Sequence, residues 1–349
     1  MATDTLVKPA RTAKASPPAW RRLLGSWDAI LILALLVVVL VASATIEGVG
    51  SPRFYRFLVL EAIPIALIAL PMTLVIITGE IDLSVASAVG LTCSVLGQLW
   101  HLGVTSLPLL IVLSLLLGAV LGAVNGVFIT VFGLPSLAVT IGTLALYRGL
   151  AYVVLGDRAI ADYPQAWTQN AVAPIPGTVI PWFVLVLAAL AVMFGVLLYV
   201  TPIGRSLYAI GNNAEASNFA GISVLRTKFW LFVATGATAA LAGVFWTFRF
   251  ASARADNATG LELSVVAAVL LGGVSIFGGR GGLVGVIAAV ALLGVLRNAL
   301  QLADVPANAL TIVTGALLIL SVVGPNLVRM ARERLRRRRP AIATERTLS

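Results

Sequence analysis

About ten apolar segments, each close to the length needed to cross a lipid bilayer, follow one another from Ala29 to Gly324. A transmembrane helix requires about 20 predominantly apolar residues. This length rule predicts spans at 27–46, 57–78, 84–101, 107–131, 136–155, 178–200, 229–250, 261–277, 283–302 and 307–324. The sequence therefore predicts an all-α polytopic membrane protein.

The composition supports the same class and excludes several others. The chain is 60% hydrophobic and 11% charged, whereas soluble domains carry about 25% charged residues. One cysteine, Cys93, excludes a disulfide framework and a Cys-based zinc site, and the single His101 fits a segment end better than a metal site. A phosphate-binding G-x-x-x-x-G-K-[ST] loop is absent, and the glycine-rich Gly278–Gly282 lacks its lysine. We predict no catalytic residue, metal or cofactor, and we expect any ATP hydrolysis in a separate subunit.

The net charge of +10 is concentrated in the two tails. Lys and Arg flanking membrane spans are typical of cytoplasmic segments, and the run Arg336–Arg339 is suited to anionic lipid headgroups. Membrane lipid, rather than nucleic acid, is the expected partner. Ten spans place both termini on one side, so we predict a cytoplasmic tail at 1–26, a permease domain at 27–324 and a second cytoplasmic tail at 325–349.

Small residues predict close helix packing. Gly118, Gly122 and Gly126 form a G-x-x-x-G-x-x-x-G pattern within one span, and small residues at this spacing let helices approach closely in lipid. Asn125 followed by Pro135 is echoed by Asn298 followed by Pro306. The two copies would cross the membrane in opposite directions, as in the inverted repeats of many transporters.

Polar residues interrupt the apolar segments. Thr78–Ser84 contains Glu80 and Asp82 between two spans, where Asp82 or Ser84 can cap a new helix. This break either faces a polar path or is a capped turn without a role in transport. Asn125, Thr140, Thr143 and Asn298 either line a path or form hydrogen bonds between helices. The same choice applies to the charged residues Glu61, Arg148, Glu262 and Arg297.

The longest polar loop that carries basic residues, 201–228, mixes apolar residues with helix signals. Gly211 and Gly221 are suited to ending short helices. Tyr208 and Phe219 are apolar residues that a soluble partner can cover. The pattern predicts one or two short helices on the cytoplasmic face that receive a push from a partner.

Several ordered motifs resemble one known family. The stretch Thr78–Val85 (TGEIDLSV) resembles the G-G-I-D-L-S-V-G signature of ribose-type ABC transporter permeases. The similarity continues through Gly122–Gly126, Pro135–Thr143 and Gly204–Ile222, and then from Glu262 to Gly281. It covers most of the chain from Phe57 to Gly324. One departure is Glu80, which stands where the family signature has glycine.

The resemblance implies an inner-membrane permease subunit of a bacterial sugar importer. Such permeases pair with a second permease, identical or related, bind ATPase subunits inside and receive sugar from a periplasmic binding protein. By this similarity the ATPase-coupling residues are Gly204, Arg205, Tyr208, Ala209, Gly211, Asn213, Glu215, Ala216, Gly221 and Ile222, and Asp82, Ser84, Asn125 and Thr140 match motif positions near the translocation pathway. The polar residues Glu80, Thr143 and Asn298 complete the predicted pathway set without a family match.

Two alternatives stay open at the level of the sequence. An ion-coupled secondary transporter of a small polar solute would use Glu80, Asp82 and Glu262 as relay groups. A membrane scaffold would need no polar path. The identity of the cargo is open as well, because Glu80 adds a charge beside Asp82 and leaves room for deoxysugars or a sugar-derived signal.

Overall fold

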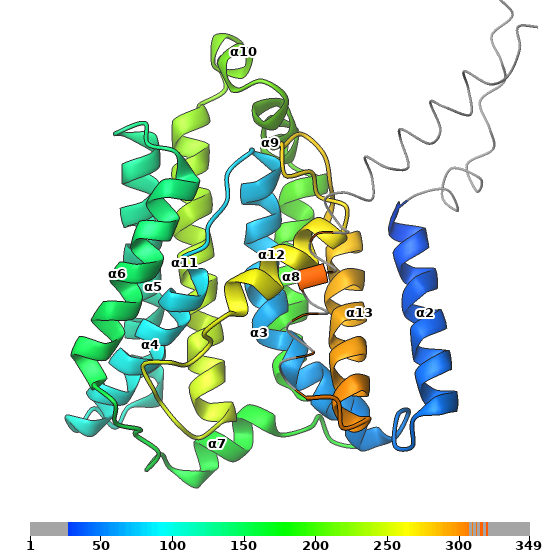
Figure 1. Ribbon diagram of the computed structural model, residues 1–349. Helices are drawn as coiled ribbons and strands as arrows, with labels where there is room; N and C mark the ends of the chain where they lie inside the picture. Colours follow the sequence, from blue (N-terminus) through cyan, green and yellow to red (C-terminus); the bar gives the residue numbers. More distant parts are fainter. Residues whose placement is uncertain (1–26, 307–308, 310–311, 313–314, 317–318, 320–349) are drawn as a thin grey trace, which may run out of the picture.

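The computed structural model describes residues 27–306 and the isolated positions 309, 312, 315, 316 and 319. Within these residues every regular element is helical (Figure 1). In order they are α2 (Trp27–Thr45), α3 (Pro52–Ile77), α4 (Val85–His101), α5 (Leu107–Thr130), α6 (Ser136–Leu155), α7 (Gln165–Val172), α8 (Phe183–Tyr199), α9 (Pro202–Asn212), α10 (Ala214–Phe219), α11 (Val224–Arg249), α12 (Leu261–Leu271) and α13 (Leu283–Leu302). The prediction of an all-α membrane protein is confirmed at this level.

Six described helices are long and apolar enough to cross a membrane: α2, α3, α5, α6, α11 and α13. A seventh span results if α8 and α9, which meet at a bend of 68°, are counted together. Apart from those isolated positions, the predicted segment 307–324 and both tails lie outside the residues that the structure describes. The second copy of the Asn…Pro pattern, Asn298 and Pro306, ends where the continuous description ends.

Several predicted span boundaries are wrong, and local residues explain the differences. Ser51 caps α3 with its side chain, accepting from the Phe54 amide, so α3 begins at Pro52 rather than at 57. The predicted span 261–277 is helical only to Leu271, because Gly272 ends it and Gly273 takes a positive φ of 88°. The 11 residues of α12 extend about 16 Å, half of a bilayer core.

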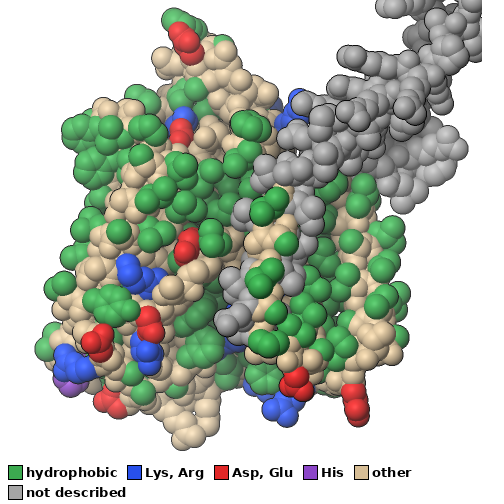
Figure 2. All heavy atoms as spheres, viewed as in Figure 1, with side chains coloured by type: hydrophobic (Ala, Val, Ile, Leu, Met, Phe, Trp, Pro, Cys, Tyr) green, Lys and Arg blue, Asp and Glu red, His purple; other side chains and the backbone are tan. Residues whose placement is uncertain are grey.

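The interior of the bundle is built on α3 and α11. Of the apolar window of α3, 78% is buried, against 11% of that of α2. Hydrophobic side chains on α2, α6 and α8, including Leu40, Val153 and Val192, are exposed and form the surface that faces lipid. Figure 2 shows hydrophobic side chains over most of the middle of one face and several charged ones gathered at its lower end.

Glycines bring α5 and α11 into backbone contact. A Cβ on Gly118 would overlap the Gly236 carbonyl, and one on Gly122 would overlap the Phe232 carbonyl. Gly126 lies against Phe229. Because lipid tails give helices no hydrophobic reason to associate, such close van der Waals packing is a main source of their affinity. The Gly-x-x-x-Gly stripe of α5 thus lies in a helix interface.

We expect Gly122→Ala and Gly142→Ala to have opposite effects on stability. The methyl group at Gly122 must displace α11 and should cost about 1–3 kcal/mol. Gly142, on α6, has nothing within 4 Å of an added Cβ, and alanine there should gain up to about 1 kcal/mol of helix propensity. Thermal unfolding of the purified variants in detergent measures both. Equal melting temperatures would contradict the interface.

Two stretches without helix meet at one end of the bundle. We name the end that carries α9 and α10 the α9 end, and the opposite end, which carries α7, the α7 end (Figure 1). From the α9 end of α3, residues 78–84 descend to α4, which begins part-way along the bundle (Figure 1). Residues 272–282 connect α12 and α13 and reach back to α9. The first stretch brings polar backbone into the body of the protein, whereas the second, in which Phe277 and Arg280 are exposed, lies at the α9 end.

Candidate coupling surface, polar interior and outer cavity

Helix α9 lies directly on the backbone of two other segments. A Cβ on Gly211 would overlap the Ile77 carbonyl at the end of α3 and the Gly279 amide in the 272–282 stretch. The Gly279 amide in turn donates to the Ile77 carbonyl at 2.9 Å. Glycine at 211 is therefore the only residue that permits this three-way contact without displacement of the backbone.

Tyrosines tie the same segments together. The Tyr208 hydroxyl donates to the Gly281 carbonyl at 2.8 Å. The Leu283 amide, at the start of α13, donates to the Tyr199 hydroxyl at 2.8 Å. At the other end of α9, Gly204 is buried against the Leu198 carbonyl at the bend after α8. A displacement of α9 therefore acts directly on α3, α8 and α13.

Helix α10 points away from the bundle (Figure 1). Asn213 caps it, accepting from the Ala216 amide at 2.8 Å, and Gly221 ends it with a φ of 82°. Phe219 on this helix is 85% exposed. Arg205, Ala209, Glu215, Ala216 and Ile222 complete the predicted coupling set; Arg205, Glu215 and Ala216 are exposed, and Ala209 and Ile222 are half-buried.

Three of the predicted pathway residues form one hydrogen-bonded chain. The Asp82 carboxylate accepts from the Ser84 amide at 2.9 Å and from the Ser84 hydroxyl at 2.6 Å. Asn125, on α5, donates to the Ser84 hydroxyl at 2.8 Å. All three side chains are buried. This chain fixes the start of α4 against α5.

Helix α6 binds the backbone of the same stretch. The Ile81 amide donates to the Ser136 hydroxyl at 3.2 Å, and the Thr140 hydroxyl donates to the Ile81 carbonyl at 3.3 Å. Thr143 bonds back to the Thr140 carbonyl. Thr140 and Thr143 are buried too. In this conformation both hydroxyls are used by carbonyl groups of the chain itself, those of Ile81 and Thr140.

Glu80 forms an ion pair with Lys228 near the start of α11, and their side chains are only 16% and 14% exposed. The Glu80 carboxylate, which stands where the family signature has glycine, thus has a partner of opposite charge on another helix. Lys228 carried no signal of this role in the sequence, since the two residues are 148 positions apart. The pair connects the descending stretch to the segment that follows α10.

We expect Lys228→Met to destabilise the protein and Glu80→Gln to rescue part of the loss. The single change leaves a mostly buried carboxylate without its partner, at a cost of about 1–3 kcal/mol. The double variant removes both charges, so its unfolding temperature should be closer to that of the wild type than the unfolding temperature of Lys228→Met. Arg226→Met, at an exposed position on the same helix, is the matched control. Additive losses in thermal unfolding would show that the pair contributes nothing.

Asn298 lies apart from the other predicted pathway residues. Its amide donates to Glu61 at 2.9 Å, on α3, and Glu61 lies 4.0 Å from the Arg249 guanidinium. These residues adjoin a cavity of about 220 Å³ between α3, α11, α12 and α13. Sequence reasoning missed the cavity because its lining comes from four distant segments; the only signal was charge within spans.

Comparison with known proteins assigns the family. The profile of a permease family described as "branched-chain amino acid transport system / permease component" matches residues 54–322. The chain belongs to this permease family. The resemblance drawn from the motifs, to importer permeases, is confirmed, and the permease is a multi-pass membrane protein.

Full-length relatives agree with this assignment. The LsrD permease protein of the autoinducer 2 import system of Salmonella paratyphi A is 36% identical over 316 residues, which are 87% of this chain and 92% of the relative. The LsrD protein of Escherichia coli O9:H4 is 35% identical over 314 residues, 87% of this chain and 93% of the relative. No solved structure matches the chain.

Proposed function

We propose that this permease is the membrane-spanning subunit of an ATP-driven importer of a sugar-like solute, with force entering through α9 and α10. The observation that carries the proposal is the contact of Gly211 with Ile77 and Gly279. It joins the helix pair at the membrane surface to the end of α3, from which the 78–84 stretch descends, and to the 272–282 stretch. A push on α9 therefore acts on the point where the interior stretch begins.

The proposal includes partners of defined kind. An ATPase subunit binds the α9 end, a binding protein delivers the solute at the opposite end, and a second permease completes the path. The autoinducer 2 import systems of the LsrD relatives support a small sugar-like cargo. Asp82, Ser84, Asn125 and Thr140 have a positioning role in this scheme, because they hold the 78–84 stretch rather than contact the solute.

We expect Phe219→Ser to weaken binding of the ATPase. Phe219 is an exposed aromatic side chain at the tip of α10, and buried aromatic anchors carry a large share of binding energy at protein interfaces. Co-purification of the ATPase with the tagged permease from membranes should fall by tenfold or more. Phe132→Ser, at an exposed position in the α5–α6 loop, is the matched control. Undiminished recovery with Phe219→Ser would reject α10 as the docking element.

The energy source is tested with the complete transporter. Uptake into vesicles should persist under a protonophore while ATP is supplied, because the motor is the ATPase and not an ion gradient. Loss of uptake on collapse of the gradient, with ATP intact, would instead support the ion-coupled alternative.

We further propose ten membrane segments with an inverted repeat and both termini cytoplasmic. The basic residues of the tails and of the 201–228 loop support this orientation. A fluorescent protein fused after Ser349 should fold and fluoresce, and alkaline phosphatase fused there should be inactive. Active phosphatase at that position would reverse the orientation.

A further inference from the structure

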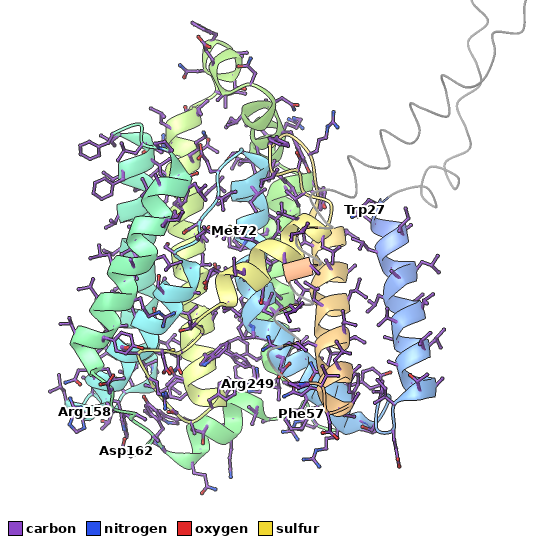
Figure 3. The ribbon with its side chains drawn as sticks, in the orientation of Figure 1. Trp27, Phe57, Met72, Arg158, Asp162 and Arg249 are labelled. Carbon is purple, nitrogen blue, oxygen red and sulfur yellow. The ribbon has the colours of Figure 1, made fainter. Side chains whose placement is uncertain are left out.

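Charged side chains gather around the cavity between α3, α11, α12 and α13, which we name the outer cavity. Glu61, Arg249 and Arg297 line it together with Trp246, Phe250 and Ser264. In Figure 3, Arg249 and Phe57 lie toward the α7 end of the bundle, opposite to α9 and α10. The cavity therefore belongs to the end at which solute would enter, on the scheme proposed above.

Partners among the described residues account for only some of these charges. Arg249 donates to the Leu60 carbonyl at 2.7 Å and lies beside Glu61, whose second oxygen accepts from Asn298. Arg297 lines the same cavity as Arg249 and has no hydrogen bond or ion pair within the described residues. In that part of the chain, one guanidinium at the cavity wall is thus without a partner.

Charged side chains within membrane helices are costly in free energy when they face lipid. Glu61 is nine residues into α3, about 14 Å from its start, and Arg297 is five residues from the end of α13. An acidic group at the depth of Glu61 in a membrane helix faces a water-filled cavity, a solute path or a partner of opposite charge. A single water needs only about 10–15 Å³ of such space, so the outer cavity has room for several waters or for a small solute.

Two neighbouring hollows extend the outer cavity toward the surface. Both are lined by Arg249 and Phe250, and both add Arg53 and Phe57. One of them also includes Arg56. Across the three spaces the lining contains four arginines and one acid, Glu61. A net positive, aromatic-lined approach concentrates oxygen-rich and anionic solutes.

We infer that the outer cavity is a solute-binding subsite for a polyhydroxylated solute of sugar size, with Arg297 and Arg249 as hydrogen-bond donors and Glu61 as acceptor. A solute with several hydroxyl groups needs donors and acceptors together, and the Trp246 ring offers an apolar surface for the C–H face of such a molecule. The free charge of Arg297 favours anionic derivatives over neutral ones. The inference deepens the proposed function and rests on it for the direction of transport.

A reporter thiol in the cavity tests the inference without any other subunit. Ser264 is a half-buried residue of the lining, and the native Cys93 is buried, so Ser264→Cys in a Cys93→Ala background gives one accessible thiol. With each rate divided by the same reagent's rate toward a free thiol in solution, an anionic methanethiosulfonate should label it about tenfold faster than its trimethylammonium counterpart. Arg297→Gln should reduce that ratio, whereas Arg158→Gln, an exposed arginine at the same end, should not.

Protection from labelling identifies the solute class. At equal millimolar concentration, ribose 5-phosphate should slow the reaction most and ribose less, while choline should have no effect. The protection should be lost in Arg297→Gln. Equal labelling by both reagents, each rate taken relative to that with a free thiol, would overturn the inference. Lack of protection by either sugar compound would overturn it as well. Failure of the ATPase to co-purify would reject the proposed function alone, because the thiol measurement does not depend on it.

Discussion

The need to satisfy backbone polar groups away from water governs the interior of this permease. Non-helical backbone at membrane depth is tolerated only where protein or a water-filled cavity provides partners. The stretch between α3 and α4 meets this requirement through side chains of its neighbours: Ser136 and Thr140 serve both groups of Ile81, and Asp82 serves the Ser84 amide. Arg148 does the same nearby, donating to the carbonyls of Ala86 and Asn257. These polar residues are thus accounted for by the backbone that they hold.

The sequence predicts elements well where apolar length decides them. The spans at 107–131, 136–155 and 283–302 coincide closely with α5, α6 and α13 because nothing but hydropathy and end signals sets them. Prediction from the sequence fails where tertiary contacts determine where a helix ends. The 261–277 segment is apolar enough to continue, yet Gly272 is pressed against Val286, and Gly273 turns the chain. Likewise α7 is a short helix in a polar loop, and no hydrophobic periodicity in the sequence predicts it.

Pairings between distant residues show the same limit for the candidate site. Motif similarity located Asp82, Ser84 and Asn125, and the structure brings these three together. The pattern of polar residues within spans placed Asn298 in the same predicted set, whereas it lies beside Glu61 in a separate cluster. The partner of Glu80 is 148 residues away, and a charge alone does not say which of several basic residues it meets. Spacing predicts local caps and helix faces, but contact across the bundle depends on how the helices cross.

Helix α3 connects the two ends at which partners are proposed to act. Its last residue, Ile77, accepts from Gly279 and lies under Gly211, while Glu61 on the same helix borders the outer cavity. Pro64 and Pro71 lie in α3 between Glu61 and Ile77 and each removes a helix hydrogen bond, so the tight packing of its buried surface, rather than a complete hydrogen-bond ladder, limits how α3 can bend. On the proposed scheme, a displacement imposed at α9 reaches the wall that carries Glu61 through this packed helix. The acceptor of the outer cavity would then shift relative to Arg297 on α13, and a solute held between them would lose one side of its binding site.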